Sequence, residues 1–355
     1  MSSNETTSAK DAAPSQEILT RRAFNAAAPI AQLPPELLAE IFLLRVPKTA
    51  AQMRDISWFK VSHVCRTWRE TALAFPAFWA TPITRSRPLT KMMVARAGAT
   101  PLVLRSDESP RRASAFLRTY PTRIGAIDVE EQQLMIKYIL DRSGMVRAAA
   151  PHLRAVKIVK RYPCPGDDNG IGTWLEADLL CRAEVLAQGG APLRTRLHLE
   201  CCAFPWQSAW YSQLAHLHLQ RLSGAYSLSL EELFSILLRS RNLETLALID
   251  VGLHGPPGAP LVLTQLRALR LRAPHTSCTQ LMTQLTLPAI ARLDIEVPGN
   301  PDSDADADSR DVLPQQSALL VTCLQHPRIL GAQDRLNVDV VDKWDIVASW
   351  SRGDE

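Results

Sequence analysis

The chain has 355 residues, of which 46% are hydrophobic and 21% are charged, and its formal net charge is +4. This composition is typical of a globular protein and excludes collagen-like or strongly charged disordered chains. No segment has the ~20 apolar residues of a transmembrane helix, no apolar secretion signal is readable, and the seven cysteines form no CxxC pair. We therefore expect reduced thiols, no membrane partner, and a location in the cytoplasm, the nucleus or both.

The N-terminal part predicts a disordered tail followed by a helix. Residues 1–28 are rich in Ser, Thr, Ala and Asn, a composition that favours disorder. Pro34 and Pro35 suit the first turn of a helix, which Pro47 closes. The apolar residues of this helix form a wide arc, with Leu37, Ile41 and Leu44 on one face and Leu38 and Phe42 on an adjoining one.

A second helix is predicted from Trp58 to Ala72. Its apolar residues recur at helical spacing at Trp58, Val61, Cys65, Trp68 and Ala72. Two helices this short cannot bury so much apolar surface between themselves. Exposed apolar patches of this kind usually mark a partner site.

The next segment is basic. Residues 85–123 hold nine Arg and Lys against Asp107 and Glu108, a net charge of +7. Such a segment can contact phosphate backbones, but nucleic-acid modules usually interleave aromatic residues, and here only Phe116 and Tyr120 are present. We expect a solvated basic face or a surface for acidic targets, and keep nucleic-acid binding as a weaker alternative. Within this segment, Pro88 to Leu104 predicts a helix followed by a strand.

An apolar-x-x-apolar-x-apolar pattern recurs beyond residue 123. Its copies are Ile124/Ile127/Val129, Leu153/Val156/Ile158, Leu214/Leu217/Leu219, Leu243/Leu246/Leu248, Leu266/Leu269/Leu271 and Ile290/Leu293/Ile295, with less regular copies at Leu197/Leu199 and Leu336/Val338. The steps between the seven copies up to Leu293 are 29, 41, 20, 29, 23 and 24 residues. Steps in the twenties resemble a leucine-rich repeat, in which each copy supplies one parallel strand.

Helices are predicted between these strands. They cover 130–147, 173–188, 230–239, a short segment from Ser277, and 313–325. Ser229 and Glu232 form a capping box that opens the helix at Leu230. Strands that alternate with helices predict an α/β fold, with a parallel sheet and helices on its outer face.

The polar residues between the apolar positions would form the open, concave face of this sheet. The candidates for contact with a target are Lys157, His198, Glu200, His218, Gln220, Arg270, Arg272 and Asp294. Arg270 would neighbour Asp294, and Arg272 would neighbour Glu296. These pairs are interpreted either as cross-strand charge pairing or as part of a recognition surface, and the sequence does not choose.

Metal, cofactor and catalytic sites are not expected. His198, Cys201, Cys202, His216 and His218 have ligand atoms for zinc but lack the spacing of a structural site. The aspartates at 302, 304, 306 and 308 fail the calcium-loop pattern, because Ala307 and Leu313 stand where Gly and Glu are needed. Residues 298–312 are predicted to be a solvated acidic loop. Nucleotide-binding and hydrolase motifs are absent, so we expect no enzyme.

Three N-terminal pieces, taken in order, resemble a known family. Leu33 to Phe42, then Val61 to Arg69, then Pro76 to Trp79 resemble an F-box, in the form common in fungal F-box-like proteins. The resemblance implies an all-helical adaptor-binding domain over 29–84 and a leucine-rich-repeat-like solenoid over 85–355 that recognises a substrate. The residues that would bind a Skp-type adaptor are Leu33, Pro34, Pro35, Leu37, Leu38, Ile41, Phe42, Val61, Val64, Cys65 and Trp68, of which Trp68 would brace the domain itself.

The function implied by this resemblance is that of a substrate receptor. Such a subunit links a target protein to a cullin-based ubiquitin ligase through the adaptor. The alternative is a leucine-rich-repeat scaffold whose binding does not lead to ubiquitination. The identity of the target is not in the sequence.

Overall fold

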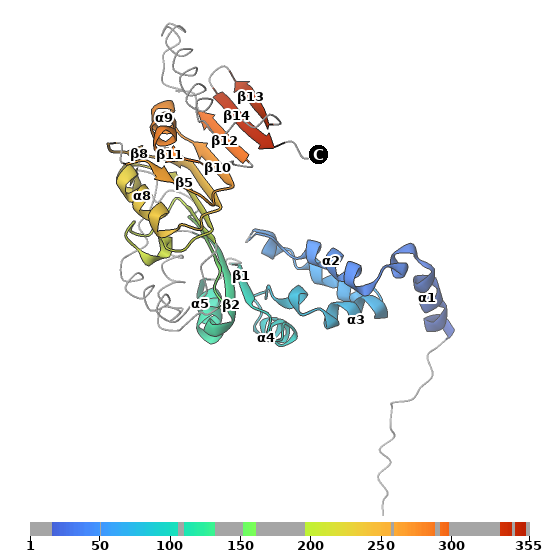
Figure 1. Ribbon diagram of the computed structural model, residues 1–355. Coiled ribbons are helices and arrows are strands. Elements are labelled where there is room, and N and C mark those ends of the chain that lie inside the picture. The colour runs from blue at the N-terminus through green and yellow to red at the C-terminus, as the bar shows by residue number, and fades with distance from the viewer. Residues whose placement is uncertain are drawn as a thin grey trace, which may run out of the picture.

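The computed structural model describes residues 16–49, 51–105, 110–131, 152–160, 196–256, 259–287, 292–297, 334–342 and 345–352. Figure 1 shows a helical N-terminal module that projects from one end of a twisted sheet. The helices of the module are α1 (Gln16–Ala27), η1 (Pro29–Gln32), α2 (Pro35–Arg45), η2 (Ala51–Arg54), η3 (Ser57–His63), α3 (Arg66–Ala74), η4 (Pro76–Trp79) and α4 (Arg87–Arg96). No helix among the described residues is long and apolar enough to cross a membrane.

Helix α1 lies where the sequence predicts a disordered tail over residues 1–28, so the prediction is wrong from Gln16 onward. An ion pair between Arg21 Nη2 and Glu17 Oε1, at 2.5 Å, links two turns of the helix. Such i,i+4 pairs support an isolated helix. None of the residues of α1 is buried.

The first predicted helix is confirmed and the second is divided. Helix α2 begins at Pro35 and ends before Pro47, as expected. The segment from Trp58 to Ala72 instead forms η3 and α3, because Cys65 between them is extended, with φ −151°. Arg69 Nε donates to the backbone oxygen of Ser62 at 3.1 Å, which satisfies a carbonyl freed by the break.

Aromatic residues hold the module together. The ring of Phe42 lies 5.2 Å from that of Trp68 and 6.0 Å from that of Phe78, measured between centroids. Trp79 is 1% exposed, and its Nε1 donates to the backbone oxygen of Ala72 at 2.7 Å. The guanidinium of Arg96 lies over the Trp79 ring, 4.4 Å from its centroid. Rings contributed by α2, α3 and η4 therefore fix these elements against one another.

The module is joined to the sheet by hydrogen bonds and a shared core. The amide of Val103 donates to the backbone oxygen of Ala80 at 2.8 Å. Arg105 Nε donates to the backbone oxygen of Lys48 at 3.2 Å. One hydrophobic cluster runs from Leu38 in α2 to Ile295 in the last parallel strand. The two parts are therefore packed as one body rather than linked by an open hinge.

The sheet contains ten strands in the described residues, in the order β1-β2-β3-β4-β5-β7-β10-β12-β14-β13. The first eight are parallel: β1 (Leu102–Arg105), β2 (Ile124–Glu131), β3 (Ala155–Lys160), β4 (Arg196–Glu200), β5 (His216–Leu222), β7 (Thr245–Val251), β10 (Ala268–Arg272) and β12 (Arg292–Val297). Seven of them coincide with predicted copies of the apolar pattern, and β1 coincides with the strand predicted up to Leu104. The copy at Leu197/Leu199, which is less regular in sequence, forms the regular parallel strand β4. A mostly parallel α/β sheet is thus confirmed.

One expectation about the sheet and one about a helix are wrong. The copy at Leu336/Val338 lies in β13 (Asp334–Asp342), an antiparallel edge strand that pairs with β14 (Asp345–Arg352) and not with β12. The hairpin reverses the chain direction, so the parallel order ends at β12. The helix predicted over 130–147 cannot begin at Glu130, because Glu130 and Glu131 end strand β2. The rest of that helix, those over 173–188 and 313–325, and the acidic loop over 298–312 lie outside the described residues.

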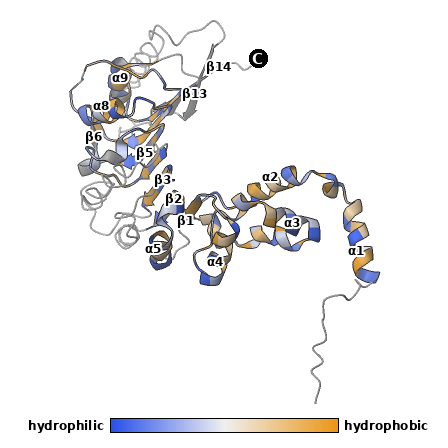
Figure 2. Ribbon diagram, turned by 60° about the horizontal axis from the view of Figure 1, so that its bottom comes forward, coloured by the Kyte–Doolittle hydropathy of each residue, from blue (hydrophilic) through white to orange (hydrophobic). Residues whose placement is uncertain are grey.

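Helices cover one face of the sheet. Figures 1 and 2 show α8 (Leu230–Arg239) and α9 (His275–Gln284) on the face away from the side toward which the module projects. The capping box of α8 is confirmed, since Glu232 N donates to Ser229 Oγ at 3.1 Å. Helix α9 begins two residues before the predicted Ser277.

The remaining elements are short or were not predicted. They are α5 (Pro110–Thr119), η5 (Pro121–Arg123), η7 (Ala209–Tyr211), η8 (Gly224–Tyr226), β6 (Leu228–Ser229), β8 (Leu253–His254), β9 (Leu261–Val262) and β11 (Leu285–Thr286). Parallel pairing of β6 with β8 and of β9 with β11 forms two small ladders beside the main sheet.

Candidate partner-binding surfaces

Exposed apolar side chains are concentrated on the helical module. Among the described residues, ten of twelve exposed large hydrophobic residues belong to it: Ile18, Leu19, Phe24, Ile30, Leu37, Ile41, Leu44, Ile56, Val64 and Leu73. The other two, Leu238 and Val262, belong to the sheet region. Figure 2 shows hydrophobic residues along α1 and α2. Exposed apolar patches of this kind usually mark interaction sites.

Helix α2 divides its apolar residues between two faces. Leu38 and Phe42 are 2% and 1% exposed, and they pack in the core of the module. Leu37 is 53% exposed, Ile41 is 38% exposed and Leu44 is 75% exposed, and their i, i+4, i+7 spacing places them on one outer face. Leu38 and Phe42 therefore anchor α2 in the core of the module, while Leu37, Ile41 and Leu44 are accessible to a partner.

The other predicted adaptor residues also fall into groups. Pro34, Pro35 and Val64 are exposed, and Val64 is 59% exposed. Leu33 and Cys65 are half-buried. Val61 and Trp68 are half-buried and pack against the core, which fits the expectation that Trp68 braces the module.

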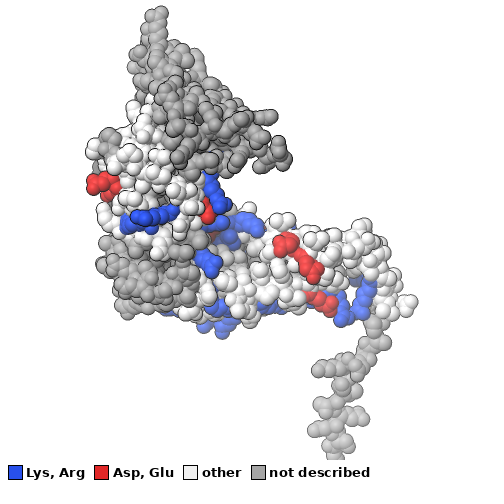
Figure 3. Space-filling view, in the orientation of Figure 1, with Lys and Arg blue, Asp and Glu red and all other residues white. Residues whose placement is uncertain are grey.

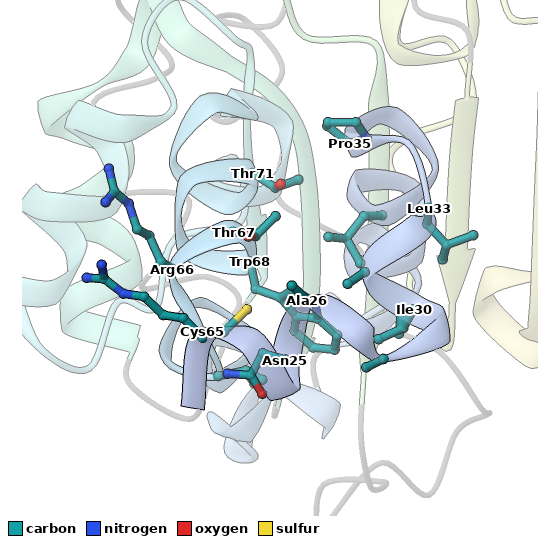
Figure 4. Close-up of a pocket in the computed structure, with 15 residues that line it drawn as sticks. Asn25, Ala26, Ile30, Leu33, Pro35, Cys65, Arg66, Thr67, Trp68 and Thr71 are labelled. Atoms are coloured by element: carbon teal, nitrogen blue, oxygen red, sulfur yellow. The ribbon is translucent and has the colours of Figure 1, made fainter. Parts of the chain in front are cut away.

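A pocket of about 300 Å³ lies between α1, the start of α2 and the start of α3. Figure 4 shows Leu33, Ile30 and Pro35 on one side of it, the α3 residues on the other, and α1 residues at one end. The pocket is lined by Arg22, Asn25, Ala26, Ala28, Ile30, Ala31, Leu33, Pro35, Leu38, Val64, Cys65, Arg66, Thr67, Trp68 and Thr71. Six of the predicted adaptor residues thus meet in one place, and α1 contributes to it without having been predicted.

The predicted polar rows of the sheet are confirmed by the strand register. One row runs across the strands through Arg105, Asp128, Lys157, His198, His218, Ala247, Arg270 and Asp294. The next row runs through Glu130, Val159, Glu200, Gln220, Ile249, Arg272 and Glu296. All eight candidate target-facing residues therefore lie on one face. Figure 3 shows basic and acidic side chains close together in the recess between the sheet region and the module.

Ion pairs occupy both ends of this face. Asp128 is buried, and its carboxylate lies 3.4 Å from Arg105 Nε and 3.7 Å from Lys157 Nζ. Burial raises the pKa of Asp128, although both cations oppose this. The sequence predicts Arg105 as part of the basic segment and not as a member of this row. The short strand β1 does not carry the repeated apolar pattern, so its register with β2 could not be read from the sequence.

At the other end, one of the two expected pairs is an ion pair. Arg272 Nη1 lies 3.1 Å from Glu296 Oε1, and its Nε lies 3.1 Å from Asp250 Oδ1. Arg270 and Asp294 are adjacent in register, as predicted. The carboxylate of Asp294 instead contacts Arg292 Nε at 2.8 Å. Asp294 thus forms an ion pair with Arg292 on its own strand rather than with Arg270 on the neighbouring strand.

The centre of the face combines two neutral imidazoles with one ion pair. The rings of His198 and His218 are stacked, 4.0 Å apart with planes 10° from parallel. Burial lowers the pKa of His198 to about 3 and lowers that of His218 as well. Both imidazoles are therefore neutral at pH 7. His218 Nε2 lies 3.1 Å from Gln220 Oε1, and Glu200 pairs with Arg221.

The residues considered for zinc do not form a metal site in the described part of the chain. No group of three His, Cys, Asp or Glu residues there is arranged to hold an ion. Cys202 is fully buried, its thiol donates to the backbone oxygen of Ile158 at 3.6 Å, and burial raises its pKa to about 12. This thiol is protonated at neutral pH, so it is a poor metal ligand and a poor nucleophile.

Several basic residues of the 85–123 segment are engaged within the protein. Arg85 donates to the backbone oxygen of Arg54, and Arg123 donates to those of Val94 and Thr100. Arg96 lies over Trp79 and Arg105 pairs with Asp128, as described above. Four of the nine cations thus have structural partners, which reduces the charge available for phosphate contacts.

Comparison with known proteins identifies the module. Residues 30–85 match the family model described as F-box-like, within one residue of the predicted 29–84 domain. No curated protein and no solved structure matches the chain. The N-terminal part therefore contains an F-box-like domain, a kind of domain that generally binds a Skp-type adaptor. Helix α1 precedes the matched residues.

Proposed function

We propose that this chain is the substrate-receptor subunit of a cullin-based, SCF-type E3 ubiquitin ligase. The F-box-like module docks on a Skp-type adaptor, and the sheet region binds the target protein. The observation that carries the proposal is the coincidence of the family match with the exposed apolar cluster. Residues 30–85 contain seven of the twelve exposed large hydrophobic side chains among the described residues.

The docking face has the composition of an interface centre. Leu37, Ile41 and Leu44 are aliphatic and exposed on α2, and Val64 is exposed at the start of α3. Burial of such side chains by a partner is favourable in proportion to the apolar area removed from water. A few buried anchors usually carry most of the binding energy of an interface. These four residues are our candidates for that role.

The open face of the sheet is the proposed target site. We interpret the repeated strands as an irregular leucine-rich-repeat-like solenoid. Its candidate residues are those of the two polar rows, with the neutral pair His198 and His218 at the centre and ion pairs at both ends. A target with polar central contacts and charged flanks would match this arrangement.

The chain would act by proximity and perform no chemical step itself. Holding a target on the same complex as a ubiquitin-carrying enzyme raises the effective concentration of its lysines. The shared core between module and sheet supports this role, because it holds the target at a fixed position relative to the adaptor. The buried Trp79 and the Arg105 contact with Lys48 contribute to that connection.

Affinity purification of the full chain with mass spectrometry tests the proposal. The continuous core makes deletion of residues 29–84 a disruptive change, so point variants are preferable. Val64 and Val262 are matched, being 59% and 57% exposed. We expect the wild type and Val262→Asp to recover a Skp-type adaptor and a cullin, and Val64→Asp to lose both.

Target behaviour separates the proposal from the alternative scaffold. A substrate receptor should shorten the lifetime of a recovered target protein, and Val64→Asp should restore it. If adaptor and cullin are absent from the wild-type sample while other proteins are enriched, the chain is a scaffold and the proposed function is wrong.

A further inference from the structure

The contacts of α1 within the protein do not account for its stability as a helix. It is a twelve-residue helix, and none of its residues is buried. Isolated helices shorter than ~12–15 residues are marginal in water. It nevertheless exposes Ile18 at 44%, Leu19 at 47% and Phe24 at 78%. A helix of this kind gains most of its stability from a surface that covers it.

One side of α1 is directed toward the rest of the helical module. Arg22, Asn25 and Ala26 line the 300 Å³ pocket, and their i, i+3, i+4 spacing defines one face of the helix. Ile18 stands one turn before Arg22 on that same face. Phe24 and Ala23 do not line the pocket. The pocket side of α1 is therefore distinct from the rest of its surface.

The pocket shares residues with the proposed adaptor surface. Its other walls include Leu33, Pro35, Val64 and Cys65, which belong to the predicted adaptor residues. The lining is mostly apolar, and Arg22 and Arg66 are its cationic residues. Arg66 is engaged by Glu70 at 2.7 Å. An apolar side chain flanked by a carboxylate fits this combination of walls and charge.

We propose that α1, although it precedes the F-box-like residues 30–85, is part of the adaptor-binding surface. The pocket between α1 and the start of α3 receives an apolar side chain of the Skp-type adaptor, next to an acidic residue that pairs with Arg22. Docking on the adaptor stabilises α1. This inference rests on the proposed function, since it names a second contact region for the same partner.

Two matched substitutions in α1 test the inference in the full chain. Ala26→Trp places a large ring in the pocket, and Ala23→Trp places the same ring on a part of α1 outside it. Neither alanine is buried, so the rest of the module should fold normally. By isothermal titration with a purified Skp-type adaptor, we expect Ala26→Trp to weaken binding at least tenfold and Ala23→Trp to stay within threefold of wild type.

Two further measurements examine the charge and the order of α1. Arg22→Glu should weaken adaptor binding about tenfold at low salt and by less at high salt, because screening reduces the contact with a carboxylate. Hydrogen exchange should show the amides of residues 20–27 exchanging at least tenfold more slowly in the complex than in the free chain.

The outcomes distinguish the inference from the proposed function. If the wild type does not bind the adaptor at all, the proposed function fails, and with it the premise of this inference. If the wild type binds, but Ala26→Trp binds equally well and α1 gains no protection, the inference is overturned while the proposed function stands. Equal losses for Ala26→Trp and Ala23→Trp would also overturn it, because the pocket would then have no special part.

Discussion

Replacing Leu37 and Leu44 together by alanine should weaken adaptor binding by about thirtyfold without unfolding the module. Full burial of a leucine side chain is worth ~2 kcal/mol. Leu37 is 53% exposed and Leu44 is 75% exposed, so together they offer more than one complete side chain to a partner. Alanine keeps the Cβ atom, which leaves a loss of about 2 kcal/mol, or roughly thirtyfold in Kd. Isothermal titration of the full chain with a purified Skp-type adaptor measures this change.

Two control variants make the result specific. Leu238, which is 52% exposed on α8, is the matched control, and Leu238→Ala should bind the adaptor normally. Leu38 neighbours Leu37 but is 2% exposed, so Leu38→Ala should reduce the free energy of unfolding by about 2–5 kcal/mol. Unchanged adaptor affinity in the Leu37→Ala/Leu44→Ala variant, with binding otherwise intact, would refute the assignment of this face.

Three other predictions concern stability. Ser229→Ala should lower the free energy of unfolding by about 1 kcal/mol in urea titrations, because it removes the cap of α8, and no loss would contradict that role. Deleting residues 340–355 should lower the melting temperature and increase dye binding, because it removes β14 and uncovers the edge of β12; an unchanged melting curve would contradict this. His198 has a pKa of about 3 when folded against 6.5 ordinarily, so the unfolded chain takes up the proton first and stability falls as pH drops below about 6.5. The free energy of unfolding should fall by up to ~1.4 kcal/mol per pH unit. In urea titrations at pH 7 and pH 5, His198→Gln should lose less stability between the two pH values than the wild type. An equal loss in both proteins would exclude His198 as its source.

The parallel sheet could be predicted because each strand carries its own signal. Leu246 and Leu248 alternate with polar or small residues, and the same spacing recurs at Leu269 and Leu271. Matching positions of equivalent copies align in a parallel sheet, so the rows through His218 and Arg270 followed from the pattern alone. The capping box at Ser229 is likewise local, since both partners lie within four residues.

Features that depend on how side chains and elements pack in three dimensions could not be predicted. The carboxylate of Asp294 contacts Arg292 rather than Arg270, a choice between two neighbouring cations that side-chain geometry decides. The antiparallel direction of β14 depends on the edge of β12. The break at Cys65 separates η3, whose Trp58 packs against Phe78, from α3, whose Trp68 packs against Phe42.

The predicted adaptor residues show the same division. Helical periodicity gave Leu37 and Ile41 one face and Leu38 and Phe42 another, but periodicity does not say which face the protein itself covers. The packing of Phe42 against Trp68 and Phe78 decides this in favour of the second. Helix α1 was missed because its polar, alanine-rich sequence is typical of a tail, and its place beside the pocket is visible only in three dimensions.

Co-expression with a Skp-type adaptor, followed by size-exclusion chromatography, tests the central claim most directly. We expect the full-length chain and the adaptor to elute together as a complex with one copy of each. If the wild-type chain is soluble and elutes alone, while the adaptor elutes separately, the account of the helical module as an adaptor-binding domain is wrong.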